Sequence, residues 1–271
     1  MTFSVVGRSA DGASVGVAVA SKFLAVGAAV PAAEAEVGAV ATQSYANLSY
    51  RPDGLAMLRS GRSARDTLDA LVAADEGRTQ RQAGVVDRTG GAATYTGDGC
   101  HPWAGGRTGE GFAVQGNILV GPEVVEAMAA AWLGADGAPL PERLIVTLAA
   151  GDDAGGDRRG RQSAALLVAR RGGGYGGESD VEVDLRVDDH TAPVAELRRL
   201  LDLHQLYFGT PDPATLLPLE GELAAEVAAR LSSLGHPTLD DWAGVENFEE
   251  RMVDGAIDPL VLEQLRATSE V

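Results

Sequence analysis

Cysteine, histidine and lysine are all scarce in this chain of 271 residues. Its single cysteine, Cys100, excludes an intramolecular disulfide framework and cannot by itself supply a thiolate cluster for a metal. The four histidines are far apart in the sequence and form no HExxH or HxH pair. We therefore expect no metal site built from protein side chains.

Positive charge is also in short supply. The 22 basic side chains are outnumbered by 39 acidic ones, which gives a formal net charge of −17 and an isoelectric point near 4.5. Such a chain repels phosphates, which argues against nucleic acid or an anionic membrane surface as a partner. The excess is uneven, because residues 212–271 contain 13 acidic and 3 basic side chains. All but one of the basic residues are arginine, and the one lysine is Lys22.

Long hydrophobic runs are absent. The most apolar stretch, Ser14–Ala35, is interrupted by Lys22, and Asp11 precedes it beside Arg8. A signal peptide needs a basic segment followed by an unbroken apolar one, and a membrane helix needs about 20 apolar residues. We therefore predict a cytoplasmic globular protein with no membrane partner.

Hydrophobic patterning predicts strands, and capping residues predict the helices between them. The first two strand-like runs are joined at Asp11-Gly12, a turn signal that predicts a hairpin beginning at the second residue. Ser63, with Asp66 three residues later, is a variant of the capping box. Strands are expected at residues 2–7, 14–21, 37–44, 82–87, 92–97, 112–121, 163–169 and 181–189, and helices from about residues 52, 64, 123, 141 and 193.

The order of these elements is strands, two helices, strands, two helices, strands and a helix. It lacks the regular alternation of strand and helix that builds a parallel doubly wound sheet. It suits an α+β fold in which two antiparallel sheets pack together and helices cover their outer faces.

The composition changes after Phe208. Residues 210–218 contain three prolines, which predicts a linker between a large domain of residues 1–209 and a small acidic helical domain of residues 219–271. In the small domain, LSSLGHPTLDDWAGVENFEER and IDPLVLEQLR resemble helical modules of the peptidoglycan-binding type. Its acidity and the lack of a secretion signal weaken a wall-binding role, so packing or oligomerisation is the simpler interpretation.

Thr2 is the first candidate for chemistry. Methionine is readily trimmed before a residue as small as threonine, and removal of Met1 would expose Thr2 with a free α-amine. The hydroxyl could then act as nucleophile, with the α-amine, whose typical pKa is about 8, as its base. No separate histidine would be needed. Threonine at a second position is nonetheless common and carries little weight alone.

Lys22 is the second candidate. The predicted hairpin places it at the end of the second strand, adjacent to the strand that starts at Thr2. A lysine near that hydroxyl would lower its pKa and stabilise the charge that develops on it. Arginine could not easily replace lysine in a tight site, because its guanidinium is larger, planar and always charged. The alternative is a residual surface lysine.

A strand that opens with Thr2, a hairpin and a lysine at the end of the second strand together resemble the N-terminal nucleophile (Ntn) hydrolases, which include proteasome β-subunits. More closely, MTFSVVGR, GVAVASKFLAVGAAVP, GAVATQSYAN, VQGNILVGPEVV, GGDRRGRQSAALLV and VDLRVDDH are similar to a bacterial and archaeal family of unknown function within that superfamily. The similarity covers about residues 1–210. It implies a four-layer αββα sandwich, amide hydrolysis by an exposed Thr2, Lys22 in the activating position, and a homo-oligomer (dimer or higher).

Further polar residues follow the predicted strands. In GNILVG, the side-chain amide of Asn117 could donate to an oxyanion hole, although an asparagine in a turn beside a glycine bulge explains it equally well. Four more residues are expected to bind substrate in the same cleft: Ser4, Gln43, Ser44 and Asn47. The last three are equally plausible as turn residues.

The stretch GGDRRGRQS, residues 155–163, is the strongest internal motif. It resembles neither a P-loop nor a GxGxxG motif, and we expect no cofactor. In the Ntn superfamily a loop near this position often supplies an acid and a serine that orient the nucleophile. By that resemblance Asp157 and Ser163 are expected to support Thr2, and Arg158 or Arg161 could bind a substrate carboxylate in a bidentate manner. The alternative is an arginine–aspartate network at a subunit contact.

Two hypotheses follow for function. In the first, the protein is an Ntn-type amidohydrolase in which Thr2 attacks an amide of a small molecule or peptide and forms an acyl-enzyme that water releases. In the second, it is a non-catalytic binding or scaffold protein that retains the Ntn fold and keeps Met1. With Met1 in place, the nitrogen of Thr2 is part of a peptide bond and cannot act as the base.

Overall fold

The computed structural model describes residues 2–269, and Met1, whose removal the sequence predicts, lies outside them. The chain divides into two compact units, one up to Leu200 and the other from Leu201. The division falls inside helix α6, Pro193–Phe208. The last turns of α6 contribute Leu206 and Tyr207 to the core of the second unit.

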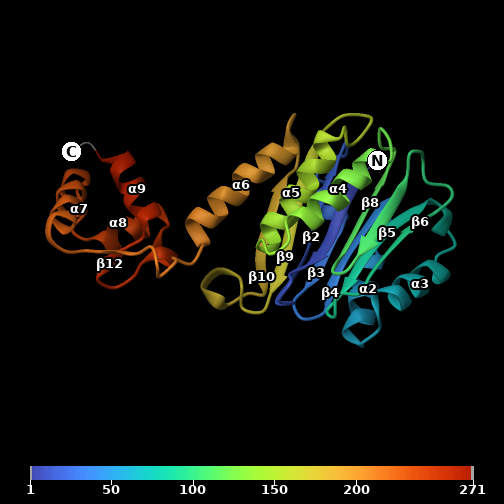
Figure 1. Ribbon diagram of the computed structural model, residues 1–271, viewed down its shortest axis with the longest axis horizontal. Coiled ribbons are helices and arrows are strands. Elements are labelled where there is room, and N and C mark those ends of the chain that lie inside the picture. Colours follow the sequence, from blue (N-terminus) through green and yellow to red (C-terminus); the bar gives the residue numbers. More distant parts are fainter. Residues whose placement is uncertain (1, 270–271) are drawn as a thin grey trace. The chain divides into compact units, whose positions relative to one another are not determined.

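Two antiparallel sheets form the centre of the first unit (Figure 1). One has the strand order β10-β9-β2-β1-β8-β7 and the other the order β3-β4-β5-β6. β1 is an interior strand, paired with β2 on one side and β8 on the other. The strands are β1 (Thr2–Arg8), β2 (Ser14–Ser21), β3 (Pro31–Glu34), β4 (Gly38–Ser44), β5 (Arg81–Asp87), β6 (Ala92–Thr96), β7 (Gly105–Gly109), β8 (Phe112–Asn117), β9 (Ser163–Arg170) and β10 (Val181–Val187).

Helices cover the outer face of each sheet. α4 (Glu123–Gly134) and α5 (Leu140–Asp153) pack on the six-stranded sheet, while α2 (Tyr50–Arg59) and α3 (Ala64–Ala74) pack on the four-stranded sheet (Figure 1). The single turn α1 (Val26–Ala29) packs beside β9. The result is a four-layer αββα sandwich, which confirms the predicted α+β class.

The space between the sheets is filled mainly by small apolar side chains. Val6, Val17 and Val19 of the six-stranded sheet pack in one cluster with Ala41 and Val86 of the facing sheet. Side chains alternate along a strand, so the inner face of β1 continues from Val6 through two polar residues to the start of the strand. Polar groups therefore replace apolar ones at one end of the core.

Two short strands at the sheet edges, β3 and β7, were not expected from the sequence. β3 begins with a proline and β7 reads GGRTG, so neither carries the β-branched pattern of a strand. β8 ends at Asn117, four residues earlier than predicted, because Ile118 has a φ of 50° and turns the chain. The predicted cap of α3 is present, since the Ser63 hydroxyl accepts the Asp66 N–H.

After the end of α6, the described part of the second unit (residues up to 269) contains the helices α7 (Gly221–Leu234), α8 (Leu239–Glu246) and α9 (Pro259–Thr268), and the short strand pair β11 (Leu217–Pro218) and β12 (Ala256–Ile257). They enclose a core with Trp242, Phe248 and Leu265 at its centre. A buried ion pair between Arg251 and Asp258 lies within this unit. No helix in residues 2–269 combines the length and apolarity needed to cross a membrane.

Candidate active site

Thr2 begins β1, where its neighbours in the sheet are Ser21 of β2 and Asn117 of β8. Two residues later, the Ser4 hydroxyl donates to Gln43 Oε1 of the facing sheet at 2.7 Å, so Ser4 lies on the inner face. Alternation along the strand then places the Thr2 side chain on the same face. Thr2 is 6% exposed and lies at one end of the space between the two sheets.

The Thr2 hydroxyl has one side-chain partner among residues 2–269. Its Oγ1 lies 3.0 Å from Ser21 Oγ, and either oxygen can be the donor. Ser21 is buried as well. Sequence reasoning missed this serine, although the predicted hairpin register pairs it with Thr2 and could have identified it.

Two side-chain amides hold the carbonyl of Thr2. Gln43 Nε2 donates to the Thr2 carbonyl oxygen at 3.2 Å, and Asn117 Nδ2 donates to the same oxygen at 3.4 Å. The same two nitrogens also donate to Gln82 Oε1, at 2.8 and 2.9 Å. Asn117 is thus engaged with the backbone of the nucleophile candidate, whereas the sequence suggested a donor for an oxyanion.

Gln82 orders this network from the four-stranded sheet. Its own nitrogen donates to the Gly116 carbonyl at 2.7 Å and to Thr96 Oγ1 at 2.9 Å, which leaves its oxygen facing the two amides. A second glutamine, Gln115, donates to Ser4 Oγ at 2.7 Å and continues the network along β1. Neither glutamine was predicted, although a glutamine within a buried strand is a signal that the sequence does contain.

Lys22 lies outside this network. Its side chain is exposed, and its ammonium makes no hydrogen bond or ion pair within residues 2–269. Ser21 is the last residue of β2 and faces inward, so the alternation that turns Ser21 toward Thr2 turns the following residue away. Lys22 instead contributes its backbone N–H, which donates to Asp157 Oδ2 at 2.8 Å.

Asp157 and Ser163 hold the loop that follows β2. The buried Asp157 carboxylate accepts the Lys22 N–H, the Arg159 N–H at 2.8 Å and the Arg159 guanidinium at 3.3 Å. Ser163 Oγ donates to the Phe23 carbonyl and accepts the Val26 N–H at 3.1 Å. Both predicted residues therefore support the strand end beside Thr2 through its backbone, without contacting the threonine.

The remaining predicted residues serve the surrounding loops. Arg161 is exposed and pairs with Asp152, its Nε lying 2.8 Å from Oδ1. Arg158 is exposed, and its N–H donates to the Ile118 carbonyl at 3.3 Å. Ser44 ends β4 with a φ of 71°, which turns the chain away from the sheet.

Asn47 belongs to a small polar cluster beside that turn. Its Nδ2 donates to Asp75 Oδ2 at 3.1 Å, and its Oδ1 accepts the Ser49 N–H. The hydrogen bond from Arg81 holds the pKa of Asp75 well below its usual range, so the carboxylate is ionised and paired. Asn47 is therefore a turn residue that anchors the loop after β4, one of the two roles expected for it.

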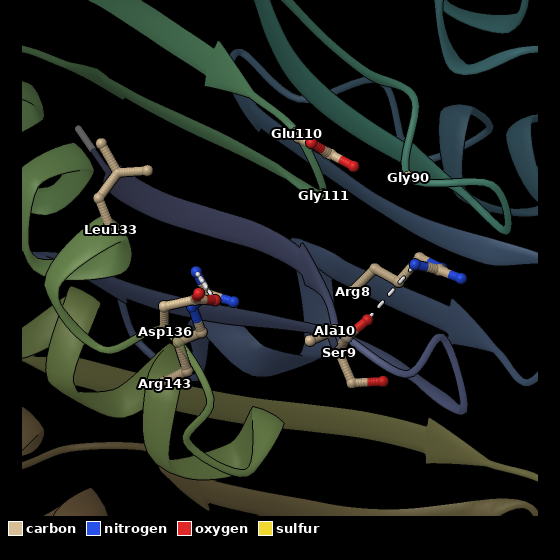
Figure 2. A pocket seen from close by; sticks show the side chains of 9 residues that line it. All are labelled: Arg8, Ser9, Ala10, Gly90, Glu110, Gly111, Leu133, Asp136 and Arg143. Atoms are coloured by element: carbon tan, nitrogen blue, oxygen red, sulfur yellow. Dashed lines mark hydrogen bonds and ion pairs between the residues drawn. The ribbon is translucent and has the colours of Figure 1, made fainter.

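The opposite end of β1 opens on a pocket of about 360 Å³ (Figure 2). Its charged lining consists of two guanidinium groups, from Arg8 and Arg143, and two carboxylates, from Glu110 and Asp136. Arg8 is the last residue of β1, so six residues of extended strand, roughly 20 Å, separate it from Thr2. The pocket is a separate feature from the Thr2 site.

No group of three or more histidine, cysteine, aspartate or glutamate side chains in residues 2–269 is arranged to hold a metal ion. The groups around Thr2 are hydroxyls, amides and backbone carbonyls, which are neutral. Such an arrangement can position a hydroxyl nucleophile and bind a neutral polar group.

Two family models match the chain. One, described as "Family of unknown function (DUF1028)", matches residues 2–197, and another, described as "Putative peptidoglycan binding domain", matches residues 207–265. The chain is similar to the crystal structure of protein SPO2555 from Silicibacter pomeroyi, which is described with the DUF1028 model. The two are 26% identical, the alignment covers 93% of this chain and 99% of that chain, and the TM-score is 0.68. Among curated proteins, none matches the chain.

Proposed function

The chain belongs to DUF1028, a family of unknown function, and from the geometry around Thr2 we propose that it is an Ntn-type amidohydrolase. Cleavage of the Met1–Thr2 bond would make Thr2 both nucleophile and base. The substrate is an amide of a small molecule or a peptide.

The observation that carries the proposal is the position of the Thr2 hydroxyl. It lies at the first residue of an interior strand, at one end of the space between the two sheets, with its rotamer held by Ser21 at 3.0 Å. The carbonyl of the same residue accepts two side-chain amides from opposite sheets. Hydroxyl, backbone and the attached nitrogen are therefore fixed relative to one another, which is the pre-organisation that a nucleophile needs.

In the proposed reaction, the α-amine takes the proton of Thr2 Oγ1 as this oxygen attacks the amide carbonyl carbon. The C–N bond of the tetrahedral intermediate then breaks, and the α-ammonium returns the proton to the leaving amine. Water attacks the resulting ester, again losing a proton to the α-amine, and the acid product leaves as Oγ1 regains its proton. The Ser21 hydroxyl can accept from Oγ1 while that oxygen carries its proton, and can donate to it once the proton has left.

The support around Thr2 has a definite role in this scheme. Asp157 and Ser163 fix the backbone after Ser21, so the Ser21 hydroxyl stays within reach of Oγ1. Gln43 and Asn117 fix the plane of the Thr2 carbonyl, and Ser21 holds the side chain, so together they fix the direction in which the α-nitrogen projects from Cα. Lys22 acts through its backbone N–H in this scheme, and its ammonium is not required.

One observation favours the alternative, a binding or scaffold protein that keeps Met1. Within residues 2–269, the hydroxyl of Thr2 contacts a serine and no side chain that can act as a base. With Met1 attached, the nitrogen of Thr2 is an amide and cannot accept the proton. The activity therefore depends wholly on cleavage of the Met1–Thr2 bond.

Periodate oxidation tests that dependence directly. Periodate cleaves the Cα–Cβ bond of an N-terminal threonine with a free amine and leaves an aldehyde that an aminooxy dye labels. We expect protein from the native host to lack Met1 by intact mass and to be labelled, and Thr2→Ala to be unlabelled. Thr2→Ala should also lose at least about 100-fold of the turnover of p-nitroanilide amides, while Thr2→Ser retains part of it. Retention of Met1, or unchanged turnover by Thr2→Ala, would sink the proposal.

A further inference from the structure

Large apolar side chains are exposed around the end of the sandwich where Thr2 lies. Five of them occupy the loops that follow β2, β4 and β8, and they are between 45% and 60% exposed. They are Phe23, Leu24, Tyr45, Leu48 and Val120, and together they are called the apolar rim here. The side chains of Ser21, Gln43 and Asn117 contact Thr2. The loops after β2 and β8 begin directly after Ser21 and Asn117, and the loop after β4 begins two residues after Gln43.

Hydrogen bonds connect these loops into one structure. The Lys22 N–H donates to Asp157, and the next residue, Arg158, donates its N–H to the Ile118 carbonyl. Ile118 in turn donates its N–H to the His101 carbonyl, and His101 Nε2 lies 3.2 Å from the Tyr45 hydroxyl. The loops that carry the apolar rim are therefore linked to one another around the Thr2 end of the sheets.

The backbone keeps part of the rim exposed. Ser163 binds the Phe23 carbonyl and the Val26 N–H, and Ala25 between them has a φ of 51°. Ser44, just before Tyr45, also has a positive φ. A loop held in this way cannot fold its apolar side chains back into the core, so they remain available to a ligand.

Three of the nearby guanidinium groups are paired with carboxylates. Arg161 pairs with Asp152, Arg159 with Asp157, and Arg81 with Asp75. A substrate carboxylate would have to displace one of these partners. These paired guanidinium groups therefore favour an uncharged group over an anionic one, whereas the exposed ammonium of Lys22, next to Phe23, is a cation that could attract an anion.

Building on the proposed function, we infer that the protein acts on amides whose acyl group is apolar and uncharged, such as a medium-length alkanoyl or an arylacetyl group. Thr2 attacks the carbonyl carbon, and the apolar rim holds the acyl chain against the end of the sandwich. The rim is thus a specificity determinant for the acyl group.

Active esters test the inference without the natural substrate. Thr2 Oγ1 attacks the ester carbonyl, p-nitrophenolate leaves, and the acyl group stays on Thr2, where intact mass detects it. We expect p-nitrophenyl octanoate and phenylacetate to acylate Thr2 about 10-fold or more faster than the acetate, after correction for their reactivity with free threonine. The hemisuccinate should be no faster than the acetate.

Paired variants locate the preference. Phe23→Ser combined with Leu24→Ser should remove most of the rate advantage that the octanoyl ester has over the acetyl ester. Leu133→Ser, a substitution of a residue 63% exposed at the opposite end, is the matched control and should change neither rate. The double variant should keep the melting temperature and the oligomeric state of the parent protein.

The possible failures are distinct. If no ester acylates Thr2, the proposed function fails. If acetyl and octanoyl groups react equally, or the hemisuccinate reacts fastest, the proposed function stands and the acyl preference is wrong. A change of oligomeric state in the Phe23→Ser/Leu24→Ser variant would assign the rim to a subunit contact and overturn its role in specificity.

Discussion

The two ends of β1 differ in the kind of polar group that surrounds them. At the Thr2 end, the groups between the sheets are hydroxyls and carboxamides, all buried and hydrogen-bonded to one another. At the Arg8 end, guanidinium and carboxylate groups line a pocket that is open to water (Figure 2). Neutral amides can be buried without desolvating a charge, so they can hold a residue rigidly in the core.

At the Arg8 end each buried charge has a partner, because burying an unpaired charge is costly: the guanidinium of Arg143 is buried and has a carboxylate beside it. Burial lowers the pKa of Arg143, and the carboxylate of Asp136, 3.3 Å away, opposes the shift. Asp136 itself is largely exposed. The Thr2 end therefore holds its groups in a fixed geometry, whereas the Arg8 end contributes to stability next to solvent. Three substitutions test this difference.

The largest effect is expected at Gln82. Gln82→Met removes the oxygen that orients both amides on the Thr2 carbonyl, so we expect the acylation rate of Thr2 to fall about 10- to 100-fold. Gln115→Met is the matched control, because Gln115 is equally buried but contacts Ser4 and Thr94 instead. Each variant should lose about 1–3 kcal/mol of stability through unpaired partners. Equal rate losses in the two variants would show that general destabilisation, and not positioning, sets the rate.

The next effect concerns Asp87, which ends β5 toward the Arg8 end of the sandwich. Its carboxylate accepts the N–H groups of Ala64, Thr89 and Gly91 and the Thr89 hydroxyl. Burial raises its pKa, but these hydrogen bonds outweigh burial, and the net pKa lies below the ordinary 3.8. The ionised group therefore stabilises the fold above the unfolded-state pKa, and that stability is lost as the pH falls through the lower folded-state pKa.

Asp87→Asn places an NH₂ against donors, and we expect a loss of about 2 kcal/mol at pH 7. The difference in unfolding free energy between Asp87→Asn and the parent protein should become smaller below about pH 4. Urea unfolding across pH measures it, and Asp69→Asn, an exposed position on the neighbouring helix α3, should show little change. Thr2 acylation should stay within two-fold of the parent rate. If the stability difference between Asp87→Asn and the parent protein became larger in acid, the lowered pKa of Asp87 would be wrong.

The smallest effect is expected at Arg143. Its Nε donates to the Trp132 carbonyl at 2.9 Å, and its guanidinium lies 4.1 Å over the Trp132 ring. Arg143→Lys keeps the charge but loses the planar stack, which should lower stability by about 1 kcal/mol in thermal unfolding. The exposed Arg107, paired with Glu126, is the control, and Arg107→Lys should be neutral. Slower acylation of Thr2 in Arg143→Lys would show that the Arg8 end influences the Thr2 site, and would contradict the separation of the two ends.

Much of the fold follows from local signals. The hairpin of β1 and β2, the cap at Ser63 and the helix at Pro193 depend on residues close together in the sequence, and each is present as predicted. β3 and β7 were missed because they are held by pairing with β4 and β8, and their own residues have little strand propensity. The end of β8 depends on the positive φ of Ile118, a residue type that rarely adopts it.

The candidate site was predicted less completely. Strand alternation brings Thr2, Gln43 and Asn117 together, as the sequence suggested. The expectation for Lys22 was based on its place at the end of the second strand, on its rarity and on the resemblance to Ntn hydrolases, and none of these determines the direction of its side chain. The roles of Asp157 and Ser163 depend on contacts with a loop about 140 residues earlier in the chain, which spacing and composition could not reveal.

The burial of Thr2 in an interior strand also has a consequence for the order of events during synthesis. β8 begins at Phe112, 110 residues after Thr2, so a ribosome adding about 5–20 residues per second makes it roughly 5 to 20 s later. Until then Thr2 lacks the neighbour that supplies Asn117, and the Met1–Thr2 bond is open to an aminopeptidase. Once β8 pairs, Thr2 is 6% exposed. Under the proposed function, removal of Met1 would therefore compete in time with closure of the sheet.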